Sequence, residues 1–245
     1  MQALNSFLIG VDDSWKDILS KAFLSLDEEY LEYLLTSDDY FPSKKKFLNA
    51  FKTLSLDKTK YILFGQDPYP RKESATGYAF IDGRVKEIFS KKGLSKEVNR
   101  ATSLRNFIKM LLLCEDLIDK NELSQERISK IDKRGLCDNI WCLKNNFEKN
   151  GVLLLNMALI FSSKQDSKIH LKRWKSFIET LLYTIEDKDI TLILFGQASK
   201  EVEKFQFSKK YKKVFFPHPY NISFITNQEV HDFFKPMNLL KNLVV

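Results

Sequence analysis

The length, composition and charge of the chain are those of a globular protein. Its 245 residues are 44% hydrophobic and 29% charged, which suits one domain with a full core and argues against long disordered segments. No apolar run approaches the ~18 residues of a membrane-spanning helix, and the chain does not begin like a signal peptide. We therefore expect no membrane association, while the net charge of +7 is compatible with a polyanionic partner.

Strand and helix patterns alternate along the chain. Four apolar runs have the length of strands and lack polar alternation, as strands buried on both faces do. In chain order, we expect helices at residues 14–23, 27–35 and 43–51, a strand at 61–64, helices at 103–118 and 138–149, a strand at 152–155, a helix at 171–185, and strands at 191–195 and 213–216. This alternation predicts an α/β fold: a single domain with a central, mostly parallel four-stranded sheet flanked by helices.

Some boundaries between these elements can be predicted from local sequence. Ser103 is a candidate N-cap, and Asn150-Gly151 is a typical end of a helix before the next strand. The polar segment 119–133 is expected to be a surface excursion. No good boundary divides the chain, so we expect a helical amino-terminal part (1–55) and a catalytic α/β core (56–245) within one domain.

Cysteine and histidine residues are few and scattered. They are Cys114, Cys137, Cys142, His170, His218 and His231. No CxxC spacing or zinc pattern is present, so we expect no metal site, no disulfide framework and a reducing, cytoplasmic location.

Two lysine-rich tracts stand out in the charge pattern. Residues 41–60 hold six lysines and one aspartate, and residues 204–213 hold five lysines and no acid. A single tract of this kind is most often a solvated face. Because both tracts adjoin predicted strands, we expect them to contribute to a surface that follows phosphates.

Polar side chains follow the predicted strands. Asp67 comes after the first strand, Asn156 after the second and His218 after the fourth. Ligands of open α/β sheets bind at the carboxyl edge of the strands. The spacing therefore predicts a cleft in which these three side chains face one another.

The chemistry of these residues narrows the class of reaction. A carboxylate opposite a histidine, without a nucleophile elbow or metal ligands, suits acid–base or electrostatic catalysis. Asn156 offers both a donor and an acceptor, as needed to read the amide-like edge of a pyrimidine. Tyr69 and Phe80, close to Asp67 in sequence, could stack on such a ring.

Several motifs resemble those of family 1 uracil-DNA glycosylases. GQDPYP at 65–70 resembles the water-activating GQDPYH of that family, and GYAF at 77–80 resembles its G-L-x-F. ATSL at 101–104 resembles the end of its PPPSL loop, and GVLLLN at 151–156 matches its uracil-reading strand. HPYNIS at 218–223 resembles its HPSPLS leucine loop. The resemblance runs in order over essentially the whole chain.

This resemblance implies the reaction and its two catalytic residues. A uracil-DNA glycosylase flips uracil out of DNA and hydrolyses the N-glycosidic bond, leaving an abasic site, in the first step of base-excision repair. Asp67 would position the water and stabilise the cationic sugar. His218 would hydrogen-bond uracil O2 as negative charge gathers on the departing base. No lysine lies in the motifs, so a monofunctional enzyme without metal or cofactor is expected.

The same resemblance implies which residues hold the base. Asn156 would read the N3 and O4 edge, and Phe80 would stack on the ring. The Gln66 backbone would contact the base, and Tyr69 would reject the methyl group of thymine.

The resemblance also implies a set of DNA contacts. Ile222 would enter the duplex as a wedge, Ser103 and Ser223 would face phosphates, and Pro68 and Pro219 belong to the DNA-contacting loops. The expected partner is uracil-containing DNA, single- or double-stranded, and the expected oligomeric state is a monomer.

The chain departs from the family at the rim that grips DNA. Pro70 replaces a histidine, Tyr220-Asn221 replaces Ser-Pro, Ala101-Thr102 replaces prolines, and Gln197 stands where serine is common. The residues assigned to base chemistry are kept. We hypothesise uracil excision with a weaker or redistributed grip that favours single strands.

Three alternatives stay open at this point. One is a catalytically weakened DNA-binding or replication-partner module, which retention of Asp67 and His218 disfavours. Another is a glycosylase for a different damaged base, which Tyr69 and Asn156 disfavour. The third is an unrelated α/β hydrolase or nucleotide-binding enzyme. It is disfavoured because the sequence contains no G-x-S-x-G, Walker loop or G-x-G-x-x-G.

Overall fold

The computed structural model describes residues 2–205 and 209–242. The chain divides into two compact units, each built from two segments. The first unit comprises Met1–Asp82 and Gly151–Val214, and the second comprises Gly83–Asn150 and Phe215–Val245. Within the described residues, no helix combines the length and the apolar character required to cross a membrane.

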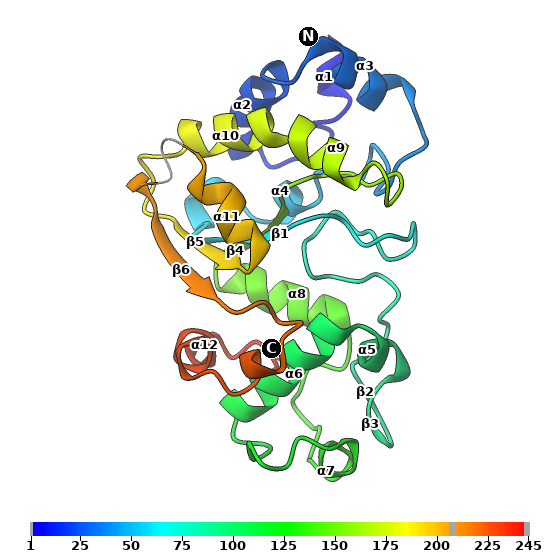
Figure 1. The fold of residues 1–245 in the computed structure, drawn as a ribbon, viewed down its shortest axis with the longest axis vertical. Helices are drawn as coiled ribbons and strands as arrows, with labels where there is room; N and C mark the ends of the chain where they lie inside the picture. Colours follow the sequence, from blue (N-terminus) through cyan, green and yellow to red (C-terminus); the bar gives the residue numbers. More distant parts are fainter. Residues whose placement is uncertain (1, 206–208, 243–245) are drawn as a thin grey trace. The chain divides into compact units, whose positions relative to one another are not determined.

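A four-stranded sheet forms the centre of the fold (Figure 1). Its strands, in the order β4-β1-β5-β6, are Val152–Asn156, Tyr61–Gly65, Thr191–Phe195 and Lys212–Phe216. β1 is parallel to both of its neighbours, with Tyr61 opposite Val152 on one side and Thr191 on the other. Each predicted strand is observed within one residue of its expected bounds. The predicted fold class, α/β with a central, mostly parallel sheet, is confirmed.

The helices of the first unit pack around an aromatic core. They are α1 (Gln2–Asn5), α2 (Asp13–Leu24), α3 (Glu28–Thr36), α4 (Ala50–Thr53), η1 (Leu56–Lys58), α9 (Ser167–Arg173), α10 (Lys175–Thr184) and α11 (Gln197–Glu203). α2 and α10 lie side by side (Figure 1), with the Phe23 and Phe177 ring centroids 5.0 Å apart. The Asp12 and Asp27 carboxylates cap α2 and α3 by accepting backbone N–H bonds.

Two helices of the first unit differ from the prediction. Residues 44–49 form turns, and α4 begins only at Ala50. The Gly77 backbone lies so close to the Lys46 carbonyl that even a Cβ would not fit between them, so tertiary packing overrides the apolar spacing. The helix predicted at 171–185 begins earlier, at Ser167, and is divided into α9 and α10 at Trp174.

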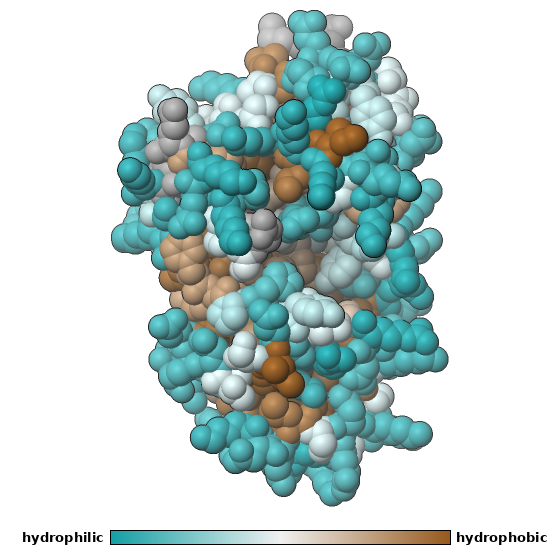
Figure 2. Space-filling view, viewed as in Figure 1, coloured by the Kyte–Doolittle hydropathy of each residue, from teal (hydrophilic) through white to brown (hydrophobic). Residues whose placement is uncertain are grey.

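The second unit is mainly helical. Its elements are β2 (Phe89–Ser90), β3 (Gly93–Leu94), α5 (Lys96–Arg100), α6 (Thr102–Cys114), α7 (Gln125–Ser129), α8 (Ile140–Lys149), η3 (Ile222–Phe224), α12 (Gln228–Phe234) and η4 (Lys235–Met237). The buried Phe107 ring contacts Phe147, Phe224 and Phe234. Hydrophilic side chains cover most of the face shown in Figure 2.

Helix boundaries in the second unit were predicted with mixed success. The N-cap prediction was wrong: α6 begins at Thr102, and Ser103 lies inside its first turn without capping it. The predicted end of α8 is confirmed, because Asn150 is its C-cap and Gly151 has a φ of 75°. The polar segment 119–133 contains the short helix α7, whose N-terminus is capped by Ser124.

The cysteines include one disulfide, although the sequence predicted no disulfide framework. Cys137, in the loop before α8, is bonded to Cys142 in the first turn of that helix. Their spacing matches no common redox or metal motif, so the sequence alone gave no sign of the bond. Cys114 is free and buried, and burial raises the pKa of its thiol to about 12.

Candidate active site

The Asp67 carboxylate, just beyond β1, has one oxygen that accepts two hydrogen bonds and one buried oxygen without a partner among the described residues. Its Oδ2 accepts hydrogen bonds from Ser167 Oγ and from Gln66 Nε2, both at 2.9 Å. Its Oδ1 is buried and has no hydrogen-bond partner among the described residues. An ionised carboxylate can accept about four hydrogen bonds. Asp67 is therefore oriented by Oδ2 and can receive a water or face a positive centre with Oδ1.

Asn156 ends β4 at the same edge of the sheet. It is paired in register with Gly65, the last residue of β1, and is only 6% exposed. A Cβ at position 65 would collide with the Asn156 Oδ1 atom. Glycine at the end of β1 thus leaves the space that the amide occupies. Met157 N and Ala158 N donate to the carbonyls of Gly65 and Gln66, which ties the two strand exits together.

The aromatic residues near Asp67 are held in a constrained loop. Phe80 has a φ of 66°, which is unusual for a non-glycine residue and costs on the order of 1–3 kcal/mol. Its ring meets Phe195 edge-on at 5.4 Å. The Tyr69 hydroxyl donates to the Phe80 carbonyl at 3.4 Å, and burial raises the pKa of Tyr69 above its usual value. Strain of this kind is typical of functional sites.

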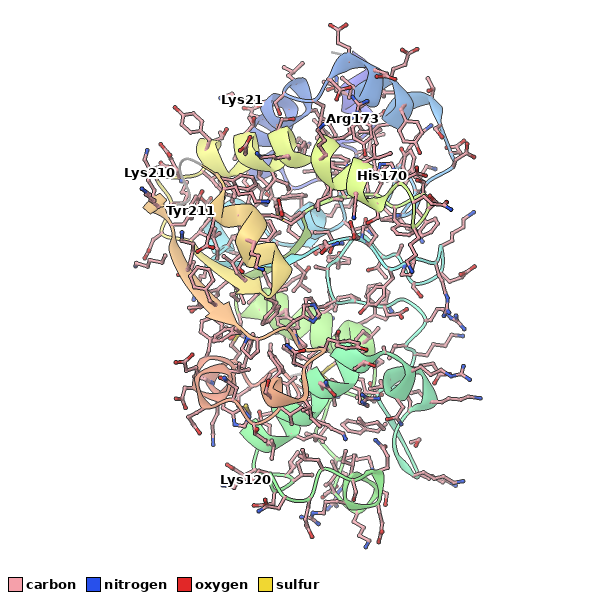
Figure 3. The ribbon with its side chains drawn as sticks, viewed as in Figure 1. Lys21, Lys120, His170, Arg173, Lys210 and Tyr211 are labelled. Carbon is pink, nitrogen blue, oxygen red and sulfur yellow. A yellow bond between two sulfur atoms is a disulfide. The ribbon has the colours of Figure 1, made fainter. Side chains whose placement is uncertain are left out.

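A second polar network surrounds His170 on α9, which Figure 3 labels together with Arg173. The His170 ring is hydrogen-bonded through Nδ1 to the Tyr30 hydroxyl at 2.7 Å and through Nε2 to Ser162 Oγ at 2.8 Å. Ser162 Oγ also bonds the Asp166 carboxylate. Burial lowers the pKa of His170, while the charges of Asp166 and Asp67 act in the opposite direction.

The helix that carries His170 also supplies Ser167, and sequence reasoning missed both residues. Polar residues at 163, 166, 167 and 170 do recur with helical spacing. That pattern could have indicated a polar helix face, but it does not identify Asp67, 100 residues away, as the partner of Ser167.

His218 belongs to the second unit, where a backbone bond fixes its tautomer. The Tyr220 N–H donates to His218 Nδ1 at 3.0 Å. A ring nitrogen that accepts a hydrogen bond carries no proton, so the proton of the neutral ring is on Nε2. Burial lowers the pKa of His218, which favours this neutral form. The side chain can therefore donate one hydrogen bond through Nε2.

Asn106 anchors the loop that carries His218. This buried residue of α6 donates through Nδ2 to the carbonyls of Pro219, at 2.8 Å, and of Tyr220, at 3.2 Å. The next residues project outward, with Tyr220 66% and Ile222 77% exposed. Ser223 is also exposed. Sequence reasoning did not find Asn106, whose partners are more than 100 residues away.

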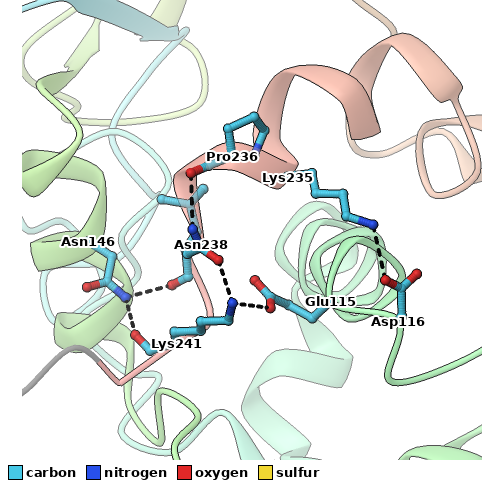
Figure 4. Close-up of polar contacts among 8 residues, drawn as sticks. Glu115, Asp116, Asn146, Lys235, Pro236, Asn238 and Lys241 are labelled. Carbon is cyan, nitrogen blue, oxygen red and sulfur yellow. Dashed lines mark hydrogen bonds and ion pairs between the residues drawn. The ribbon is translucent and has the colours of Figure 1, made fainter.

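Polar contacts also tie the carboxyl-terminal segment of this unit to α6 and α8 (Figure 4). Asn146 donates to the Lys241 carbonyl at 2.6 Å. The Lys241 ammonium in turn bonds the Asn238 side chain at 2.6 Å and pairs with Glu115 at 3.2 Å. These contacts stabilise the segment that follows α12.

The predicted site residues are divided between the two units. In the first unit lie Gln66, Asp67, Pro68, Tyr69, Phe80 and Asn156; in the second lie Ser103, His218, Pro219, Ile222 and Ser223. The side chain of Gln197 lies outside the described part of the structure. Within residues 2–205 and 209–242, no group of three or more His, Cys, Asp or Glu residues could hold a metal ion.

Comparison with known proteins decides the family. No protein-family model matches the chain. The crystal structure of wild-type UNG from Nitratifractor salsuginis is 50% identical to it, with a TM-score of 0.95, and the match covers 97% of this chain and 96% of that one. The chain belongs to the uracil-DNA glycosylase family. The predicted family and enzyme class, a hydrolase of DNA N-glycosidic bonds, are thereby confirmed.

More distant uracil-DNA glycosylases agree with this assignment. The enzyme of Fusobacterium nucleatum is 25% identical over 224 residues, which are 87% of this chain and 83% of that protein. Mimivirus uracil-DNA glycosylase is 18% identical with a TM-score of 0.58, over 87% of this chain and 71% of that one, and so shares the fold. The alternative of an unrelated α/β hydrolase is excluded.

Proposed function

We propose that this uracil-DNA glycosylase excises uracil with the Asp67 carboxylate, whose Oδ1 atom has no partner among the described residues. The main support is the hydrogen bonding of this carboxylate. Ser167 and Gln66 donate hydrogen bonds to Oδ2, while the buried Oδ1 accepts none from the described residues. Oδ1 accepts a hydrogen bond from the attacking water and faces the positive charge that develops on the sugar. Positioned acid–base groups of this kind contribute typically about 10²–10⁴-fold to a rate.

His218 supplies the second half of the proposed chemistry. As the glycosidic bond breaks, negative charge gathers on uracil, and the Nε2–H of the neutral ring donates to O2. A neutral donor avoids the cost of keeping a buried cation before the reaction. Donors placed where charge develops are worth about 10²–10³-fold in rate. The abasic site and free uracil are the products.

The first unit supplies the residues proposed to select the base. Asn156 accepts from N3–H and donates to O4, and its place depends on the missing side chain of Gly65. Phe80 stacks on the ring, and the Gln66 backbone contacts it. Tyr69, held by its bond to the Phe80 carbonyl, occupies the space that the methyl group of thymine would need.

The second unit supplies the residues proposed to hold the opened DNA. Flipping costs a few kcal/mol of stacking and pairing, and an exposed apolar wedge offsets it by filling the gap. The 77% exposure of Ile222 suits that role. Ser103 and Ser223 face phosphates, and Pro219 shapes its contacting loop, as Pro68 of the first unit does for another loop.

Several broader predictions belong to this proposal. Residues 1–245 act as one domain, and the protein is a monomer. Pro70 and the altered leucine loop weaken the grip on duplex DNA, so single-stranded uracil DNA is the better substrate. Cytoplasmic location stays a prediction from the sequence.

The direct test is a base-release assay on matched oligonucleotides. Single- and double-stranded substrates carry uracil, hypoxanthine or only normal bases, and both free base and alkali-sensitive abasic sites are measured. The proposal requires uracil release without a metal, faster on single strands. Tight binding without release would support a DNA-binding module, and release of hypoxanthine alone would support a glycosylase for another damaged base.

A further inference from the structure

Three lysines form a ridge along one face of α9 and the start of α10. Lys168, Lys172 and Lys175 are spaced by four and three residues, which places them on the same helix face. Trp174, between the two helices, keeps helical backbone angles (φ −73°, ψ −8°), so the face is continuous. The three residues, called here the lysine ridge, are exposed. Hydrophilic side chains gather over this part of the molecule in Figure 2.

Two surface hollows flank the lysine ridge. All three lysines line both hollows, whose volumes are about 890 and 220 Å³. The larger includes Ile169, and the smaller includes Met157. Side chains shared by two adjoining hollows project between them, so the ammonium groups stand where a passing chain of phosphates could reach them.

Two of the three ridge lysines form no ion pair in the described part of the chain, although Asp27, Glu179 and Glu201 line the same hollows. Within the described residues, Lys168 and Lys172 form no ion pair, and Lys175 approaches Glu179 only at 3.9 Å. Arg173, on the same helix, differs because it pairs with Asp27 at 2.6 Å and Glu29 at 3.3 Å. Unpaired ammonium groups on one face are suited to a polyanion.

The lysine-rich tract at 204–213, expected from sequence to follow phosphates, is partly paired with carboxylates. Three of its five lysines, Lys204, Lys210 and Lys212, are paired with carboxylates at 2.6–2.8 Å, while Lys209 and Lys213 form no ion pair within the described residues. Residues 206–208 of the tract lie outside the described part of the structure. The ridge on α9, which no charge run in the sequence marks, likewise has two lysines without an ion pair among the described residues, Lys168 and Lys172, and these lie on the helix that begins at Ser167, the partner of Asp67.

The ridge begins beside the proposed catalytic carboxylate. Ser167, the first residue of α9, donates to Asp67, and Lys168 is the next residue along. Lys168 also lines a hollow with Met157, which directly follows Asn156. The seven residues from Lys168 to Lys175 span about 10 Å of helix, which corresponds to about three nucleotides at ~3.4 Å per residue of one strand.

We propose that the lysine ridge binds the phosphates of the DNA strand that flanks the flipped uracil. The inference rests on the proposed function and adds a binding surface to it. It also gives a physical reason why the chain tolerates changes such as Pro70 and Tyr220 in the DNA-contacting loops. Part of the electrostatic affinity for phosphates then comes from α9. Contacts to phosphates are independent of sequence, so the ridge adds affinity and no base preference.

The test compares a ridge variant with a charge-matched control. The ridge variant is Lys168→Ala with Lys172→Ala. The control is Lys120→Ala with Lys188→Ala, two exposed lysines outside both lysine-rich tracts, of which Lys188 precedes β5 and so lies at the opposite edge of the sheet from Asp67. Equal melting temperatures establish that both are folded.

The measurement is fluorescence-anisotropy binding of single-stranded uracil oligonucleotides with short or long flanks over a salt series. Loss of two phosphate contacts is expected to reduce the slope of log K against log salt by about 1.4 for single strands, and to remove the affinity gained from a longer flank. The control keeps both properties. An unchanged slope in the ridge variant, or an equal loss in the control, overturns the inference. Failure of the proposed function would appear separately, as absence of uracil release by the unaltered protein.

Discussion

The hydrogen bond from Ser167 to Asp67 makes the sharpest prediction about catalysis. Replacing Ser167 with alanine removes one of the two donors on Oδ2 and leaves only the exposed Gln66 amide. A hydrogen bond to a charged group contributes about 1.5–3 kcal/mol, and ~1.36 kcal/mol corresponds to a tenfold change in rate. The single-turnover rate of uracil release should therefore fall by about 10- to 150-fold. Because Asp67 is partly exposed, we expect the lower part of that range.

The assay separates an effect on chemistry from an effect on binding. Single-turnover release is measured at saturating enzyme, and DNA affinity is measured beside it, with the affinity expected to stay the same. Ser167→Thr keeps a hydroxyl and should restore much of the rate. Ser163→Ala is the matched control, because Ser163 donates to the Asp166 carboxylate and not to Asp67. A Ser167→Ala rate within twofold of the parent, or a loss confined to affinity, would refute the reasoning.

Three further predictions concern pH, base recognition and stability. Burial holds the pKa of His218 below its ordinary value of 6.5. Uracil release should therefore persist at pH 6.5 and fall only at lower pH, when a proton on Nδ1 displaces the Tyr220 N–H. An acidic limb centred above pH 6.5 would contradict this. The unfolded chain binds that proton more readily, so this histidine also makes the free energy of unfolding decrease as pH falls through the same range. Gly65→Ala would displace the Asn156 amide and should lower kcat/KM for uracil DNA by about 10- to 100-fold; an unchanged kcat/KM would show that Asn156 does not depend on this space. Replacing Cys137 and Cys142 with serine opens a loop of five residues and should lower the free energy of unfolding in urea by about 2 kcal/mol; equal stability of variant and parent would be evidence against a stabilising disulfide.

The sheet and its edge could be predicted from the sequence because they depend on local signals. Buried strands such as residues 152–155 are continuous apolar runs; Asn156 directly follows this one, and Asp67 comes three residues after the run at 61–64. The helix expected at residues 43–51 failed for a non-local reason. Its apolar spacing is real, but close packing of Gly77 against the Lys46 carbonyl requires turns there.

Two of the features that sequence reasoning missed depend on distant partners. Ser167 and Asp67 are 100 residues apart, and Asn106 is 113 residues from Pro219. No pattern within one sequence records such pairs. The lysine ridge escaped notice because its members are spaced along a helix and do not form a run. The disulfide escaped notice because its spacing matches no common motif.

The proposed mechanism depends on the Oδ1 atom of Asp67, which has no hydrogen-bond partner among the described residues. It is tested most directly by single-turnover excision from a single-stranded uracil oligonucleotide, with Asp67→Asn beside the unaltered protein. Asparagine keeps the size of the side chain but removes the charge and one acceptor. Asp67→Asn should release uracil about 10²- to 10⁴-fold more slowly and should still bind DNA. Equal release by the two proteins, or no release by either, would contradict it.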